Sequence, residues 1–152
     1  MKRLSMLAVL ICAPALLAPF AAAEEASAKS EAKAAQALVE RTLVGPLAAK
    51  ESERGKFSRA SLPPQERRVR IPDEQLHKDA AGDSFVTFAV DARHGVFAAK
   101  NDSSWNLAAI SGCVYVDRGE VFVKSGDRYR PAAFLLGKNL KPAAERTCQP
   151  TS

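Results

Sequence analysis

The sequence predicts a mainly β protein: a small antiparallel meander or barrel-like sheet of about five strands, preceded by a signal peptide and an N-terminal helix. Three observations favour this fold class. Residues 1–23 have the pattern of an export signal, and residues 24–50 are rich in Ala, Glu and Lys. Eight of the nine aromatic residues after position 23 lie between Phe85 and Phe134. Because large aromatic side chains gather in cores, we expect a small disulfide-linked β domain over 83–152.

The first segment, 1–23, is interpreted as a secretory signal peptide. Lys2 and Arg3 supply the positive start, an apolar run covers 4–13, and Ala21-Ala22-Ala23 supplies the small residues that a signal peptidase needs. Cleavage is expected after Ala23. The alternative is an uncleaved anchor helix over 4–23, which its two prolines disfavour. The expected location is the periplasm or the extracellular medium, with no stable membrane span after cleavage.

Export changes the interpretation of the cysteines. After removal of the signal, Cys113 and Cys148 remain, and two cysteines in an oxidising compartment predict one disulfide. The bridge would enclose 34 residues and stabilise the fold by roughly 3–4 kcal/mol in the chain-entropy model. The alternative, a redox-active or metal-binding pair, lacks a Cys-x-x-Cys motif and a His close in sequence.

The segment 24–50 predicts a helical arm. One helical face carries an apolar stripe: Leu38, Val39, Leu43, Val44 and Leu47. Gly45-Pro46 is expected to end the helix. Because the stripe is short, we expect an arm that docks loosely or stays mobile; the alternative is a helix that binds a partner.

The next segment, 51–82, is predicted to be a charged, proline-containing linker. It mixes seven basic side chains with six acidic ones, and such a composition buries little apolar surface. Alternation over 68–71 predicts a short edge strand before Pro72. The run Arg67-Arg68-Val69-Arg70 is the densest basic patch. It is either a solvated edge or a contact for anionic envelope polymers or lipid headgroups.

The β domain itself shows period-2 patterns separated by turn residues. The strand candidates are 85–92, a weaker 105–110, 113–116, 121–123 and 128–130. Gly119 and Gly126 are available for positive φ in the two hairpin turns. Phe134-Leu135-Leu136 is expected to be buried.

The search for catalytic or metal-binding motifs is negative, so the sequence predicts no enzyme activity and no cofactor. No nucleophile, phosphate-loop or Cys/His metal pattern is present, and His77 and His94 stand apart from each other. Removal of Lys2 and Arg3 with the signal lowers the net charge from +5 to +3. A nucleic-acid-binding protein would carry a larger and more clustered positive charge, so no nucleic-acid partner is expected.

The second turn reads Ser125-Gly126-Asp127-Arg128-Tyr129. It is similar to the Ser-Gly-x-Arg-Tyr element of the bacterial periplasmic inhibitors of C-type lysozymes, which are small exported β-barrel proteins. The resemblance implies that Ser125 and Tyr129 lie on a loop inserted into the lysozyme cleft, with Lys138 in place of a downstream lysine. The family's downstream aromatic-x-Lys-Gly element is missing here, and Ser-Gly-Asp is itself a common turn string.

The same turn is the candidate binding site, formed by Lys124, Ser125, Arg128, Tyr129 and Arg130. Long cations beside an aromatic suit an anionic or sugar-bearing ligand better than a cationic lysozyme. The competing interpretation places Tyr129 in the core and the two arginines on a solvated strand face. We therefore predict a non-catalytic exported binding or envelope-associated protein. Its expected partner is an anionic envelope polymer or another exported protein, and lysozyme inhibition is the alternative.

Overall fold

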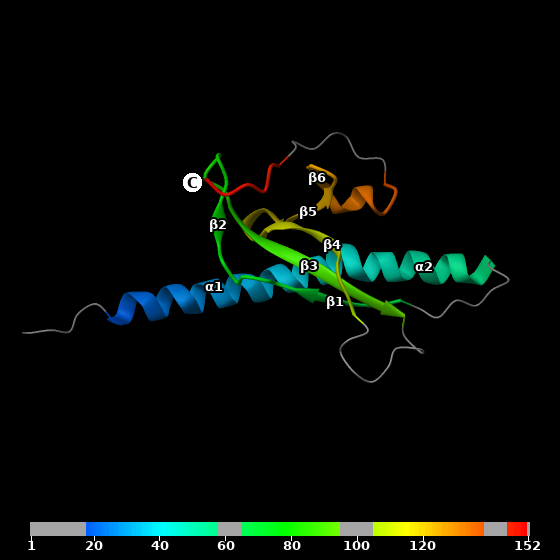
Figure 1. The fold of residues 1–152 in the computed structure, drawn as a ribbon, viewed down its shortest axis with the longest axis horizontal. Helices are drawn as coiled ribbons and strands as arrows, with labels where there is room; N and C mark the ends of the chain where they lie inside the picture. Colours follow the sequence, from blue (N-terminus) through cyan, green and yellow to red (C-terminus); the bar gives the residue numbers. More distant parts are fainter. Residues whose placement is uncertain (1–17, 58–64, 95–104, 139–145, 152) are drawn as a thin grey trace, which may run out of the picture.

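The computed structural model describes residues 18–57, 65–94, 105–138 and 146–151, in which a long helical rod packs against one open antiparallel sheet. The elements are α1 (Ala18–Val39), η1 (Glu40–Val44), α2 (Gly45–Phe57), β1 (Gln65–Arg70), β2 (His77–Lys78), β3 (Ser84–His94), β4 (Asn106–Tyr115), η3 (Val116–Arg118), β5 (Glu120–Ser125), β6 (Arg128–Pro131) and η4 (Ala132–Phe134). The sheet order is β1-β3-β4-β5-β6, and β2 pairs with β3. The fold is therefore a mixed helix-and-sheet fold, and the described strands do not close into a barrel (Figure 1).

The helical rod, α1 to α2, continues through the Gly45-Pro46 pair, so the helix end predicted there is wrong. The physical reason is the π-helical turn η1, in which the N–H of Gly45 bonds to the carbonyl of Glu40. A proline lacks the N–H for a regular helical bond, and its ring clashes with the carbonyl four residues earlier. The wider π turn leads into α2 so that Pro46 falls in the first turn of α2, where a missing N–H is tolerated.

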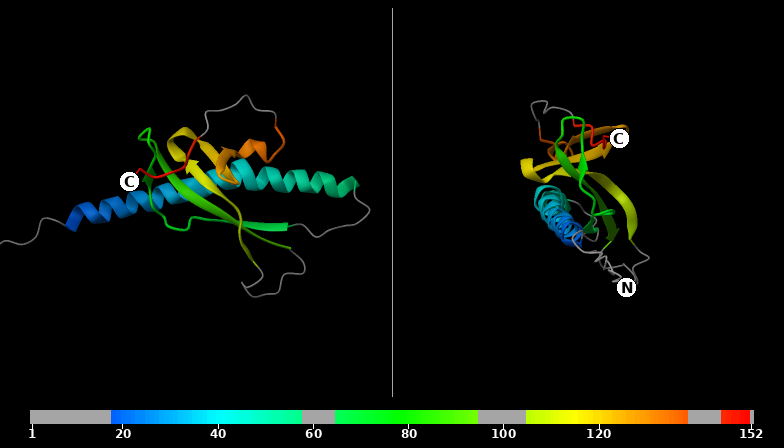
Figure 2. Two further views of the ribbon diagram at one scale, coloured as in Figure 1. Left: turned by 45° about the horizontal axis from the view of Figure 1, so that its top comes forward. Right: turned by 90° about the vertical axis from the view of Figure 1, so that its left-hand side faces the viewer.

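One face of the rod is buried against the sheet (Figure 2). Ala35, Val39 and Leu43 are fully buried and share a core with Phe88 and Val90 of β3. The predicted apolar stripe is therefore confirmed, but the loosely docked arm is wrong for this stretch of the chain. Alternation along the strands supplies enough inward-facing apolar surface to bury the stripe. Residues 1–17 of the predicted signal peptide lie outside the described residues, and 18–23 are the first residues of α1.

The sheet confirms the predicted antiparallel pattern and joins two predicted strands. Segments 105–110 and 113–116 are largely one strand, β4, which pairs with β3 along most of its length. The pairing shifts between Val90↔Ile110 and Ala92↔Asn106, so β4 bulges opposite Asp91. At Gly112 an added Cβ would overlap the carbonyl oxygen of Phe122 and lie 2.8 Å from the Phe88 ring. Glycine is required there because β5 approaches β4 so closely.

The segment 51–82 carries more structure than its composition suggests. It contains the end of α2, the predicted edge strand as β1, and the short β2. β1 is held to the rod by the ion pair of Arg67 with Glu51. Both hairpin glycines have positive φ, +65° at Gly119 and +63° at Gly126, as predicted.

The predicted burial of Phe134-Leu135-Leu136 is wrong in part. Phe134 is 49% exposed and Leu135 38% exposed. A short helical turn, η4, follows β6 directly and turns these side chains partly outward. Within the described residues, no helix has both the length and the apolar character needed to cross a lipid bilayer.

Candidate functional site

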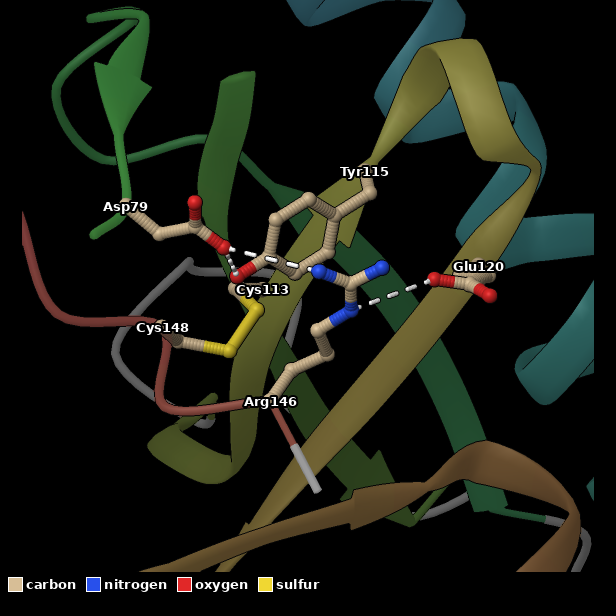
Figure 3. The surroundings of a disulfide bond; sticks show 6 residues. All are labelled: Asp79, Cys113, Tyr115, Glu120, Arg146 and Cys148. Carbon is tan, nitrogen blue, oxygen red and sulfur yellow. Dashed lines mark hydrogen bonds and ion pairs between the residues drawn. A yellow bond between two sulfur atoms is a disulfide. The ribbon is translucent and has the colours of Figure 1, made fainter. Parts of the chain in front are cut away.

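The side of the sheet opposite the rod carries a second, smaller core, closed by the C-terminal tail. Phe85, Tyr115 and Phe122 pack there with Cys113 and Cys148. The two sulfur atoms lie at disulfide-bonding distance, and the Cα atoms are 6.1 Å apart (Figure 3). This is the pairing predicted from the two cysteines that remain after position 23. The disulfide therefore attaches residues 146–151 to β4 near its C-terminal end.

A polar cluster reinforces this attachment, with Asp79 at its centre (Figure 3). The Tyr115 hydroxyl donates to Oδ2 of Asp79 over 2.9 Å, and the backbone N–H groups of Ala81 and Asp83 donate to Oδ1. Arg146 lies 2.8 Å from Asp83, 3.8 Å from Asp79 and 3.7 Å from Glu120. One arginine of the tail thus contacts carboxylates from separate segments of the chain.

The protonation states in this cluster follow from its contacts. Burial raises the pKa of Asp79, but the backbone N–H of Asp83, the Tyr115 hydroxyl, the N–H of Ala81 and the charge of Arg146 outweigh it and lower the pKa overall. Burial, followed by the bond to Asp79, raises the pKa of Tyr115 to about 12. Near neutral pH the pair therefore consists of a carboxylate and a neutral phenol in a fixed hydrogen bond, which is an arrangement that favours a structural role.

The predicted binding residues all lie on the β5–β6 hairpin, but on two faces of it. The pairs are Lys124↔Tyr129, Ser125↔Arg128 and Val123↔Arg130. Since Val123 belongs to the core beneath the rod, alternation places Ser125, Arg128 and Arg130 on that face. Tyr129 packs against the second core, and Lys124 lies on the same side. The expected side-by-side position of the two arginines is therefore present, while the aromatic lies on the opposite face and is half-buried.

A groove lies where β4 and β5 diverge beside this hairpin. Its volume is about 340 Å³, and its lining residues are Ala109, Ile110, Ser111, Val123, Lys124, Gly126 and Leu135. The partly exposed Phe134 adjoins Leu135, and the guanidinium of Arg130 stacks over the Phe134 ring at 4.5 Å. The groove therefore combines an apolar floor with one cation, Lys124, in its lining.

The turn end of the hairpin beside the groove, residues 124–130, carries three cations, Lys124, Arg128 and Arg130, and one acidic residue, Asp127. In the part of the chain that the structure describes, no acidic side chain pairs with Lys124, Arg130 or Lys138. Lys124 and Arg128 are exposed.

The lysozyme-inhibitor resemblance assigns Ser125 and Tyr129 to one inserted loop. In the structure their side chains lie on opposite faces of the β5–β6 hairpin. Ser125 is exposed at the hairpin turn, whereas Tyr129 is half-buried against the second core. Lys138 is exposed just after η4.

A second cationic group, on β1 and β3, includes part of the basic run 67–70, which the sequence left as either a solvated edge or a contact for anionic envelope polymers or lipid headgroups. Arg68 and Arg93 stack on the Trp105 ring, at 4.5 and 4.6 Å from its centroid. Asp91 is fully buried, with its Oδ2 3.6 Å from Nε of Arg68 and 3.3 Å from Nε of Arg70. The dense basic run 67–70 was the available signal, but the sequence did not indicate that Trp105 and Arg93 would join it.

No set of three or more His, Cys, Asp or Glu side chains in the described ranges is placed to hold a metal ion. His77 lies 2.9 Å from Asp73 and stacks near Phe85, with ring centroids 5.4 Å apart. The chain matches no protein-family profile, no curated protein and no solved structure.

Proposed function

We propose that this protein is an exported, non-catalytic binding protein that takes an anionic partner at the groove beside the β5–β6 hairpin. The observation that carries the proposal is that the β5–β6 hairpin beside the groove brings together Lys124, which lines the groove, and Arg128 and Arg130 on the neighbouring strand. A fold gains little by gathering like charges, so their proximity favours a ligand of opposite charge.

Export is the second component of the proposal. The signal pattern of 1–23 and the Cys113–Cys148 pair both support it, because disulfides persist mainly in oxidising compartments. Mass spectrometry of the mature protein should give a chain that begins at Glu24. A chain that retains Met1 in a membrane pellet would contradict cleavage.

The ligand class follows from the shape and charge of the groove. Leu135, Ile110 and Val123 offer an apolar floor, and Lys124 and Arg128 offer long, exposed cations. Cations of this kind bind carboxylate or phosphate groups through charge-assisted hydrogen bonds. We therefore expect an anionic envelope polymer as the partner, with binding that weakens as salt screens the charges.

The test compares two double variants that remove the same charge. Lys124→Gln with Arg128→Gln removes cations from the hairpin, and Lys33→Gln with Arg41→Gln removes two exposed cations from the rod. Sedimentation with purified cell-wall material should fall and lose salt dependence in the hairpin variant only. Equal binding by the two folded variants would refute the groove as the site. Formation of a stoichiometric inhibited complex with a C-type lysozyme would instead support the inhibitor interpretation.

A further inference from the structure

A compact set of cations and one aromatic ring occupies the face of β1 and β3, on the opposite side of the sheet from the rod. The register pairs Glu66↔Arg93, Arg68↔Asp91 and Arg70↔Ala89, so the three arginines share one face of two neighbouring strands. Val69, between them, points to the core beneath the rod. The arginine–tryptophan face, defined as Arg68, Arg70, Arg93 and Trp105, is therefore separate from the hairpin groove.

Asp91 acts as a positioning residue for this face. Its side chain is fully buried, and its Oδ2 lies beside the Nε atoms of both Arg68 and Arg70. A buried ion pair rarely stabilises a fold more than well-packed apolar residues would, so its presence favours a role in orienting charges. The two arginine side chains are nevertheless 46% and 42% exposed. Asp91 therefore holds one side of each guanidinium and leaves much of the rest accessible to solvent.

Trp105 orients the guanidiniums in a second way. Those of Arg68 and Arg93 lie over the ring at 4.5 and 4.6 Å, and Nε of Arg93 also contacts Glu66 over 2.7 Å. Stacking uses the flat face of a guanidinium, whereas its N–H groups lie in the plane and point outward. These contacts hold the planar donors in fixed positions, while the side chains of Arg68 and Arg70 stay 46% and 42% exposed.

We propose that the arginine–tryptophan face binds a phosphate group. Guanidiniums match phosphate oxygens in bidentate geometry, and a phosphate presents more charge and more acceptors to a group of arginines than a carboxylate does. Two sources supply this chemistry, a soluble phosphate compound or the headgroup of an anionic phospholipid. Both require the same donors, and Arg70 is the member that contacts Asp91 without stacking on Trp105.

Trp105 makes the proposal directly measurable, because it is the single tryptophan of the chain. Its fluorescence reports on the guanidiniums that stack on it. Titration with inorganic phosphate, matched in ionic strength by sodium chloride, tests the soluble source. Vesicles of phosphatidylglycerol, compared with vesicles of phosphatidylcholine, test the headgroup source. Saturable, phosphate-specific emission changes in either arm support the site and identify the source.

The decisive variant is Arg70→Gln, because it removes a phosphate donor and leaves the Arg68–Trp105–Arg93 stack in place. We expect binding at least about tenfold weaker, as for the loss of one charge-assisted hydrogen bond. Arg118→Gln removes an arginine paired with Asp83 at a different place and should leave the titration unchanged. The groove variant Lys124→Gln with Arg128→Gln should also respond normally, which separates this proposal from the hairpin function. Emission that follows ionic strength alone, or an unchanged response in Arg70→Gln, would overturn it.

Discussion

Replacing Tyr115 by Phe tests whether the polar cluster holds the C-terminal tail. Tyr115 is only 1% exposed, and its hydroxyl donates to the buried carboxylate of Asp79. The change removes one oxygen atom and leaves the ring contacts with Phe85 and Phe122 in place. A hydrogen bond to a charged group contributes about 1.5–3 kcal/mol. We therefore expect the free energy of unfolding to fall by that amount at pH 7.

The burial of Tyr115, together with its bond to Asp79, predicts a pH dependence of stability with a defined sign. The pKa of Tyr115 is raised from 10.0 to about 12 in the folded protein. The stabilisation is therefore complete below the unfolded pKa, and it is lost as pH rises through the folded value. At 1.36 kcal/mol per pKa unit, the shift corresponds to roughly 3 kcal/mol of stability. Wild-type protein should lose this stability between pH 10 and 12, and Tyr115→Phe should lack that component.

The acid side of the profile depends on Asp79. Its pKa is lowered in the folded state, so its stabilisation is present above the unfolded pKa and is lost as pH falls through the folded one. Urea unfolding of wild type, Tyr115→Phe, Asp79→Asn and the double variant gives a double-mutant cycle at each pH. A coupling energy below about 0.5 kcal/mol at pH 7 would refute the assignment of the hydrogen bond, because residues in one network couple more strongly.

The remaining predictions concern packing and covalent structure. Gly112→Ala should destabilise the fold by about 1–3 kcal/mol or more in urea unfolding, because its Cβ would overlap the carbonyl of Phe122. Gly55→Ala, in open space on α2, should stabilise the fold by about 0.5–1 kcal/mol. Equal effects of the two variants would contradict the close approach of Phe122 to Gly112. Cys148→Ser should cost roughly 3–4 kcal/mol, and non-reducing peptide mapping of the native protein should join it to Cys113; two free thiols would contradict the bridge. Leu43→Ala should cost about 2–5 kcal/mol, against little for the exposed Leu107→Ala, and a small effect at both would mean that the rod is not part of the core.

Local patterns in the sequence predict much of the sheet. Period-2 alternation identifies β3 and the β5–β6 hairpin, and the turn glycines mark both hairpin ends. The disulfide follows from the number of cysteines and the expected compartment. These features were predictable because each depends on residues close together in the chain or on counting residues of one type.

The features that were missed depend on contacts between distant segments. A Gly-Pro pair usually ends a helix, but here burial of Leu43 and Leu47 on the sheet favours continuation through a π turn. Gly112 lies between the predicted strands 105–110 and 113–116, and the close approach of Phe122 that joins this region into one strand is a tertiary contact. The division of the candidate site between two faces was implicit in alternation. The meeting of Arg68, Arg93 and Trp105 was not, since it depends on strand pairing.

The two cores can form at different times as the chain emerges from N-terminus to C-terminus. The core beneath the rod is complete once Ala132 is available, whereas the second core also needs Cys148. Cys113 precedes its partner by 35 positions, a delay of about 2–7 s at the usual rates of synthesis. During that interval Cys12 is the only other cysteine in the chain with which Cys113 can pair. Early removal of the segment that carries Cys12 would leave the thiol of Cys113 with a single possible partner within the chain.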